Sequence, residues 1–140
     1  MTAKEYLMQV RNTDNLINAK LREIEKLQNQ ITSLQSIQFG EKVKSSQTGD
    51  NMQKTIEKIV DMQNEINAEI DHLVDLKNQV RAKINLLSDN RYITVLTDYF
   101  INCMTFDDIA ENINYSKIQT IRIYGNALDN FGKMILNDTK

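Results

Sequence analysis

The feature that most constrains the fold is a stripe of aliphatic residues that recurs at steps of three and four over two long segments. The 140 residues include no proline, so no position forces a helix to break. In residues 52–87 the steps alternate regularly, through Ile56, Ile59, Gln63, Ile66, Ile70, Leu73, Lys77, Val80, Ile84 and Leu87. A narrow apolar stripe on a polar helix is typical of a coiled-coil seam. No run alternates like a strand, and we predict an all-α protein.

Another stripe predicts a long helix over residues 3–37. Thr2 and Glu5 are spaced as a capping box at its start, and its aliphatic positions are Leu7, Val10, Ile17, Leu21, Ile24, Leu27, Ile31 and Leu34. Residues 38–51 contain two glycines and two serines without apolar periodicity, which predicts a flexible loop. We therefore expect residues 1–87 to form a long antiparallel, coiled-coil-like helical hairpin. We also expect a homodimer, and the pattern leaves open whether the hairpin closes within one chain or swaps between two.

Residues 88–140 are expected to form a second domain of three shorter helices. Candidate core positions recur over 90–103, and Thr105 precedes a short helix over 106–113 with an acidic first turn. Asn114 and Tyr115 make a turn. Ser116 and Gln119 then form a capping box at the start of a helix that continues to about residue 135. Two short helices joined by a tight turn are the layout of a helix-turn-helix, which lays its second helix in the DNA major groove.

The last of these helices carries the candidate contact residues. Amides pair with adenine edges, arginine with guanine, and lysine or tyrosine with phosphate. The DNA-binding candidates are therefore Lys117, Gln119, Thr120, Arg122, Tyr124 and Asn126. Thr120 also belongs to the expected inner face of the helix. Ile118 and Ile121 are expected to point outward, as candidates for a protein contact or for packing beneath the hairpin. Gly125 marks either the close approach of another backbone or a tolerated cost.

Charge limits what the chain can attract without a specific arrangement. The net charge is −2, residues 1–87 hold twelve basic and twelve acidic side chains, and residues 88–140 hold five and seven. Strong non-specific attraction to nucleic acid is therefore not expected. Four acidic residues stand four positions apart, and basic residues across the hairpin partly offset them: Glu57, Asp61, Glu65 and Glu69, with Lys20, Arg22 and Lys26. We expect a solvated face, with an acidic strip for a basic partner as the alternative.

The landmarks of residues 95–131 occur in a recognisable order. They are Tyr99, the run TFDDIA at 105–110, Ser116 and the pair Ala127-Leu128. In this order and spacing the segment resembles region 4 of bacterial sigma factors, over roughly the last third of the chain. The resemblance implies a sigma-like helix-turn-helix that contacts promoter DNA or RNA polymerase. In sigma region 4 the residues after the cap are rich in Arg, Glu and Gln, whereas two of the matching positions here are Ile118 and Ile121.

Three further stretches extend the likeness to the whole chain. They are MTAKEYL at the start, TIEKIVDMQNEINAEIDHLVDLK in the middle, and the ending in which an R-x-Y-G-N-A-L run follows Tyr115. Together they are similar to a family of small proteins encoded by phages and prophages of Gram-positive bacteria. That family carries a domain-of-unknown-function label and a sigma-like C-terminus, and some related families are late-gene transcription activators. The resemblance implies origin and fold more than mechanism.

Residues for catalysis are sparse. The four glycines form no phosphate-binding loop, and Cys103 and His72 are the only cysteine and histidine, too few for a zinc site. No nucleophile and base occur in a recognisable arrangement. We therefore expect no enzymatic activity, no cofactor and no bound metal. The opening MTAKEYLMQV lacks a signal-peptide core and no run is long enough to span a membrane, which predicts a cytoplasmic protein in the host cell.

The first hypothesis is a phage-encoded, sigma-like transcription regulator. It would bind promoter DNA, RNA polymerase or both through the C-terminal helix-turn-helix. The alternative is a protein-binding module that retains this fold without strong DNA binding, as an inhibitor of a host protein such as a polymerase or a defence nuclease. A weaker possibility is an oligomer that recognises phage DNA during packaging.

Overall fold

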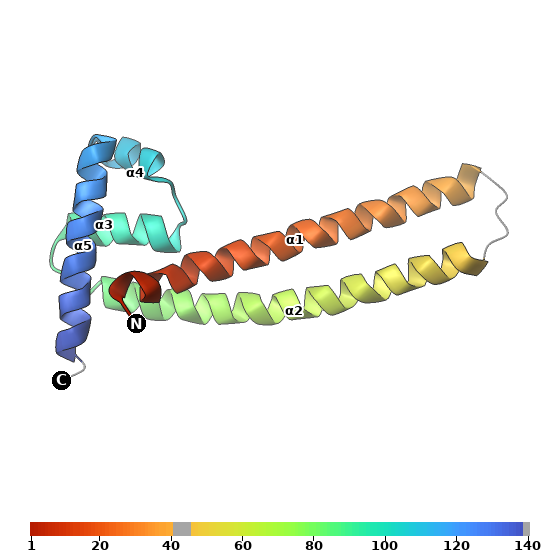
Figure 1. The fold of residues 1–140 in the computed structure, drawn as a ribbon, viewed down its shortest axis with the longest axis horizontal. Coiled ribbons are helices and arrows are strands. Elements are labelled where there is room, and N and C mark those ends of the chain that lie inside the picture. The colour runs from red at the N-terminus through yellow and green to blue at the C-terminus, as the bar shows by residue number, and fades with distance from the viewer. Residues whose placement is uncertain (41–45, 139–140) are drawn as a thin grey trace. The chain divides into compact units, whose positions relative to one another are not determined.

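The described residues form helices joined by short connections. The computed structural model describes the backbone of residues 1–40 and 46–138, and the side chains of residues 1–33 and 49–135. The elements are α1 (Ala3–Gly40), α2 (Ser46–Ile84), α3 (Asn90–Leu96), the π-helix η1 (Thr97–Ile101), α4 (Phe106–Ile113) and α5 (Lys117–Asp138). Helices α1 and α2 run antiparallel, and shorter packed helices follow them (Figure 1). The predicted all-α class and the long antiparallel helical pair are confirmed.

The loop predicted over residues 38–51 is wrong at both ends. Helix α1 continues to Gly40, and α2 begins at Ser46 instead of residue 52. A glycine costs a helix about 1 kcal/mol relative to alanine, whereas a proline costs about 3 kcal/mol, so glycine is only a weak signal that a helix ends. Residues 41–45, the centre of the predicted loop, lie outside the described residues.

Contacts divide the chain into two compact units. The first contains Met1–Asp14 and Leu73–Lys140, and the second contains Asn15–His72. The predicted domains, 1–87 and 88–140, are each one continuous segment. The first unit instead combines two segments that are far apart in the sequence. Within this unit, the Tyr6 ring of the first segment stacks on the Phe131 ring of the second, with ring centroids 6.1 Å apart.

In the second unit, α1 and α2 each bury one face. Among the described side chains of this unit, the buried aliphatic residues are Ile17, Ile24, Ile59 and Ile66. Two predicted seam positions of α2, Ile56 and Ile70, are instead 39% and 38% exposed. A helix has 3.6 residues per turn, so a pattern that combines steps of three and four is wider than the strip that one neighbouring helix covers. Within the chain, α2 therefore buries only part of its apolar stripe against α1.

One cation of the second unit links the two helices. Lys20 Nζ of α1 is hydrogen bonded to Glu69 Oε1 of α2, and it lies 3.9 Å from Glu65 Oε2. The hydrogen bond with Glu69 is the main cause of a raised pKa for Lys20. The expectation that basic residues of α1 offset the acidic face of α2 is confirmed for Lys20.

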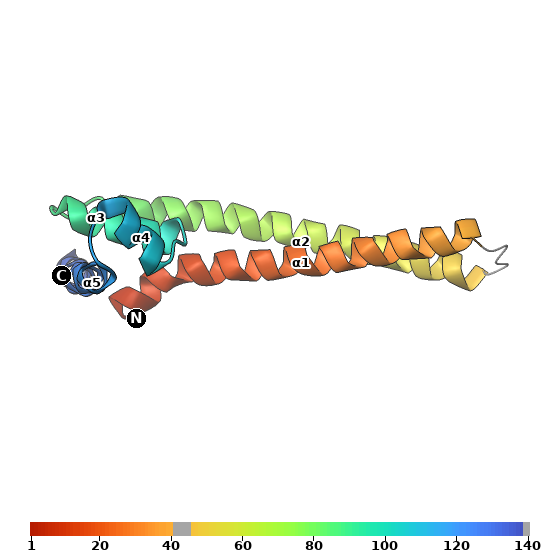
Figure 2. The ribbon, with the colours of Figure 1, turned by 90° about the horizontal axis from the view of Figure 1, so that it is seen from above.

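In the first unit, α5 packs against both α3 and α4 (Figure 2). The centre of this packing is formed by Val95, Ile109 and Ile123, which are buried together. The ends of the long helices supply further buried side chains, so the core contains residues from every helix: Leu7, Val10, Val80, Ile84, Leu96, Phe100, Ala127 and Phe131.

Side-chain caps fix where most of the helices begin. Thr2 and Glu5 exchange hydrogen bonds with each other's backbone N–H groups, both at 3.1 Å. The Asp89 side chain accepts from the N–H of Arg91 at the start of α3, and Thr105 Oγ1 accepts from the N–H of Asp108 at the start of α4. The capping signals predicted from the sequence at Thr2 and Thr105 are confirmed.

The helix predicted over 90–103 ends differently from the prediction. It changes at Thr97 into a π-turn, in which the N–H of Asn102 donates to Thr97 O at 3.0 Å, five residues back. The chain then passes through Cys103, whose φ of 55° lies in the left-handed region. Such a wide turn leaves carbonyl groups without their usual helical donors. The Cys103 side chain is half-buried, and this burial is the main cause that raises the pKa of its thiol.

Arg11 of α1 supplies the missing donors. Its Nη1 donates to Tyr99 O at 2.7 Å and to Met104 O at 3.3 Å. Its guanidinium carbon also lies 4.2 Å from the centre of the Tyr99 ring, which is the geometry of a cation–π contact. Arg11 therefore holds the segment that connects η1 to α4.

Candidate helix-turn-helix interface

The turn between α4 and α5 is set by local hydrogen bonds. Asn114 ends α4 in the left-handed conformation, with φ 61° and ψ 37°, and its N–H donates to Ala110 O. Left-handed residues commonly end helices, and asparagine tolerates this conformation better than most residues. Ser116 and Gln119 then exchange two hydrogen bonds of 3.1 Å at the start of α5. The predicted turn and second capping box are confirmed.

The inner face of α5 excludes one DNA-binding candidate. Thr120 is fully buried, and its hydroxyl donates to Ser116 O at 2.9 Å. A side chain enclosed by the core cannot reach a base or a phosphate, so its assignment to the contact surface is wrong. Its place on the inner face, which the helical spacing also predicted, is confirmed together with that of Ile123 and Ala127.

Tyr124 is a second DNA-binding candidate whose ring packs in the core. Its ring centroid lies 5.0 Å from those of Tyr99 and Phe106 and 5.8 Å from that of Phe100. Burial is the main cause that raises the pKa of the Tyr124 hydroxyl to about 12. The ring therefore holds α5 on η1 and α4, and this role was not apparent from the helical spacing alone.

Two further candidates have partners within the chain. Lys117 Nζ lies 3.4 Å from Asp107 Oδ1 of α4, although both side chains are largely exposed. Gln119 is exposed, but its Oε1 accepts the hydrogen bond from the N–H of Ser116. Contact with DNA would compete with these interactions. An exposed ion pair is weak and can be exchanged for a phosphate at little cost, whereas the cap is part of the fold.

The outer face of α5 presents the remaining candidates. Arg122 and Asn126 are exposed and make no hydrogen bond or ion pair with the described residues. Ile118 and Ile121 are 71% and 42% exposed, as predicted. No neighbouring atom lies within 4 Å of where a Cβ of Gly125 would stand. Within the described chain no backbone approaches this glycine, so the surface is flat and open at that point.

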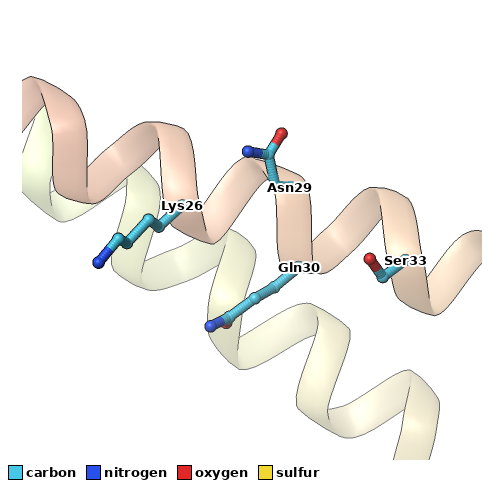
Figure 3. A pocket seen from close by; sticks show the side chains of 4 residues that line it. All are labelled: Lys26, Asn29, Gln30 and Ser33. Carbon is cyan, nitrogen blue, oxygen red and sulfur yellow. The ribbon is translucent and has the colours of Figure 1, made fainter.

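Two hollows on other parts of the surface lack polar groups that converge on one point. One is lined by Lys26, Asn29, Gln30 and Ser33, which all come from α1 (Figure 3). Asn29 extends away from the side to which Lys26 and Gln30 extend, so these groups do not converge on a common ligand. The other hollow is mainly apolar, with the Lys83 ammonium 5.4 Å from the centre of the Tyr6 ring.

The described residues include neither a membrane-spanning helix nor a metal-binding cluster. None of their helices is long and apolar enough to cross a membrane. No group of three or more histidine, cysteine, aspartate and glutamate residues in this part of the chain could hold a metal ion. Comparison with protein-family models, with curated proteins and with solved structures gives no match for this chain.

Proposed function

We propose that this chain is a phage-encoded, sigma-like transcription regulator that contacts promoter DNA through the outer face of α5. The observation that carries the proposal is the α4–turn–α5 arrangement, in which a capped helix has its inner face in the core and its outer face exposed. In helix-turn-helix proteins the N-terminal part of the second helix reaches the base edges.

The chemistry of the outer face fits a small reading surface. Arg122 matches the two acceptors of guanine, and Asn126 matches the acceptor and the donor of adenine. Gly125 adds no side chain between these residues, so a groove wall can come close to the helix. Lys117 can exchange Asp107 for a phosphate, which positions the helix without reading sequence.

The charge around α5 limits the strength of such binding. The α4 side chains Asp107 and Asp108 are exposed, and only Lys117 and Arg122 are basic in the first half of α5. Two phosphate-neutralising groups per copy give a salt dependence with a slope of about −2 in the logarithm of the binding constant. The proposed binding therefore depends on specific contacts and only weakly on non-specific attraction.

A protein target is the second candidate, and it rests on the exposure of Ile118 and Ile121. Together these two side chains form an apolar patch beside the turn, a type of surface more often found at protein contacts than at base contacts. Under this second proposal the partner is RNA polymerase, another host protein such as a defence nuclease, or both.

Selection from a random pool of duplex DNA tests the first proposal. The purified chain is mixed with the pool at moderate salt, and the retained sequences are compared with those retained by Arg122→Ala/Asn126→Ala. We expect an enriched motif for the natural sequence and its loss in the double variant. Lys133→Ala removes an exposed cation from the other end of α5 and serves as the control that keeps the motif.

The neutral pair Ile118→Ser/Ile121→Ser separates the two candidates. It removes the apolar patch without adding charge, so it leaves the electrostatic attraction to DNA intact. A motif that survives this change and is lost in Arg122→Ala/Asn126→Ala supports DNA reading. If no motif is enriched and the serine pair releases purified RNA polymerase, the first proposal fails and the protein-binding candidate is favoured.

A further inference from the structure

Helix α2 carries a second row of residues beside the face that it buries against α1. In the second unit the row consists of Ile56, Val60, Gln63, Asn67 and Ile70, at steps of four, three, four and three. This is the spacing of a coiled-coil seam. All five side chains are exposed, and Val60 is 48% exposed. Aliphatic residues at seam spacing on an already paired helix indicate a second packing surface.

The row is symmetric about residue 65. Val60 and Ile70 lie five positions on either side of it, and Gln63 and Asn67 lie two positions on either side. Ile56 lies nine positions before residue 65, and the residue nine positions after it, Val74, is also aliphatic and 51% exposed. A partner of unrelated sequence has no need of such symmetry, whereas two identical antiparallel helices place each residue opposite its mirror position, so symmetry brings like residues together.

We propose that the chain forms a homodimer in which α2 packs antiparallel on α2 of a second copy, about a two-fold axis at residue 65. In this register Val60 lies opposite Ile70 of the second copy, and Gln63 lies opposite Asn67 of the second copy. Aliphatic residues then meet aliphatic residues, and the amides can hydrogen bond to each other. A buried polar pair in a seam fixes register at some cost in stability.

The row is short, which limits the strength of the contact. From Ile56 to Ile70 it extends roughly 21 Å at 1.5 Å per residue, and a single helix is roughly 10 Å wide. A contact of α2 with α2 alone is therefore smaller than the roughly 800 Å² per copy of a standard protein interface, and we expect a dimer that dissociates on dilution. The proposal does not rest on the proposed function, because none of its residues belongs to α4 or α5.

Sedimentation equilibrium of the full chain at increasing concentration tests the dimer. We expect a monomer–dimer equilibrium that Val60→Asp weakens by about 100-fold, because the contact then buries two unpaired carboxylates. The matched control is Leu16→Asp, which changes an equally exposed aliphatic residue of α1 in the same unit. Circular dichroism verifies the helix content of both variants. A chain that stays monomeric at all concentrations, or equal weakening by both variants, would overturn the proposal.

Disulfide cross-linking tests the register without destabilising the fold. In a Cys103→Ser background, Val60→Cys/Ile70→Cys is expected to give a covalent dimer on oxidation. Each single cysteine variant is expected to give no covalent dimer. In the antiparallel register the two copies of one position lie ten residues apart along the helices, or about 15 Å, which is beyond disulfide reach. The same distance prevents a bridge within one helix. A covalent dimer from either single variant would indicate a parallel or shifted pairing and would refute the antiparallel arrangement.

Discussion

Replacing Arg11 with methionine would release the segment between η1 and α4. The 2.7 Å hydrogen bond to Tyr99 O is charge-assisted and half-buried, and at the lower end of the usual range it contributes about 1.5 kcal/mol. The 3.3 Å bond to Met104 O is long and adds about 0.5 kcal/mol. The contact with the Tyr99 ring adds another 0.5 kcal/mol or so. Methionine retains most of the apolar stem, so the expected loss of unfolding free energy is about 2.5 kcal/mol.

Urea unfolding followed by circular dichroism measures this loss, and hydrogen exchange locates it. The amides of residues 97–104 should exchange faster in Arg11→Met, because opening this segment no longer breaks the arginine contacts. Arg22→Met is the control, since Arg22 lies on the same helix and is exposed, and it should change stability by less than about 0.5 kcal/mol. Arg11→Lys keeps the charge without the planar fork and should fall between the two. Equal unfolding midpoints for Arg11→Met and Arg22→Met would refute the reasoning.

Three further changes have expected outcomes. Gly125→Ala should raise stability by about 0.5–1 kcal/mol in thermal unfolding, since the added methyl meets open space; a lower melting temperature would show that the site is strained. Ser116→Ala should cost about 1 kcal/mol, because the N–H of Gln119 loses its acceptor, and Ser116→Asp should restore most of it. The folded-state pKa of Tyr124 is raised to about 12, because the folded chain favours the neutral hydroxyl. The contribution of Tyr124 to the free energy of unfolding is therefore complete below pH 10 and declines as the pH rises towards 12. Ultraviolet titration should show a tyrosine ionisation near pH 12 that Tyr124→Phe removes, and an unchanged titration curve would contradict the assignment.

Local signals were predictable from the sequence because they involve neighbours. The capping boxes at Thr2 and Ser116 each need two residues three positions apart, and both formed as predicted. The inner face of α5 followed from the 3.6-residue period, which placed Thr120 and Ile123 in the core and Ile118 outside. For these features the helix alone determines where each side chain points.

Features that depend on another part of the chain were not predictable in this way. Arg11 and Tyr99 are separated by 88 positions, and an arginine on a polar helix gives no sign that it donates to distant carbonyls. The π-turn over Thr97–Ile101 contains Tyr99, whose carbonyl accepts one of these hydrogen bonds. The sequence of this segment alone predicts an ordinary helix. Tyr124 looked like a phosphate ligand because its hydroxyl is polar, yet three other aromatic rings determine its position.

The first unit joins Met1–Asp14 with Leu73–Lys140, which has a consequence for the chain as it is synthesised. The Tyr6 ring stacks on Phe131, and these residues are translated 125 positions apart. At about 5–20 residues per second, Tyr6 and Leu7 wait roughly 6–25 seconds for the last helix of their core. The second unit, residues 15–72, is complete long before this. We therefore expect the nascent chain to carry a folded helical pair whose apolar N-terminal turns stay open to chaperones until α5 has been synthesised.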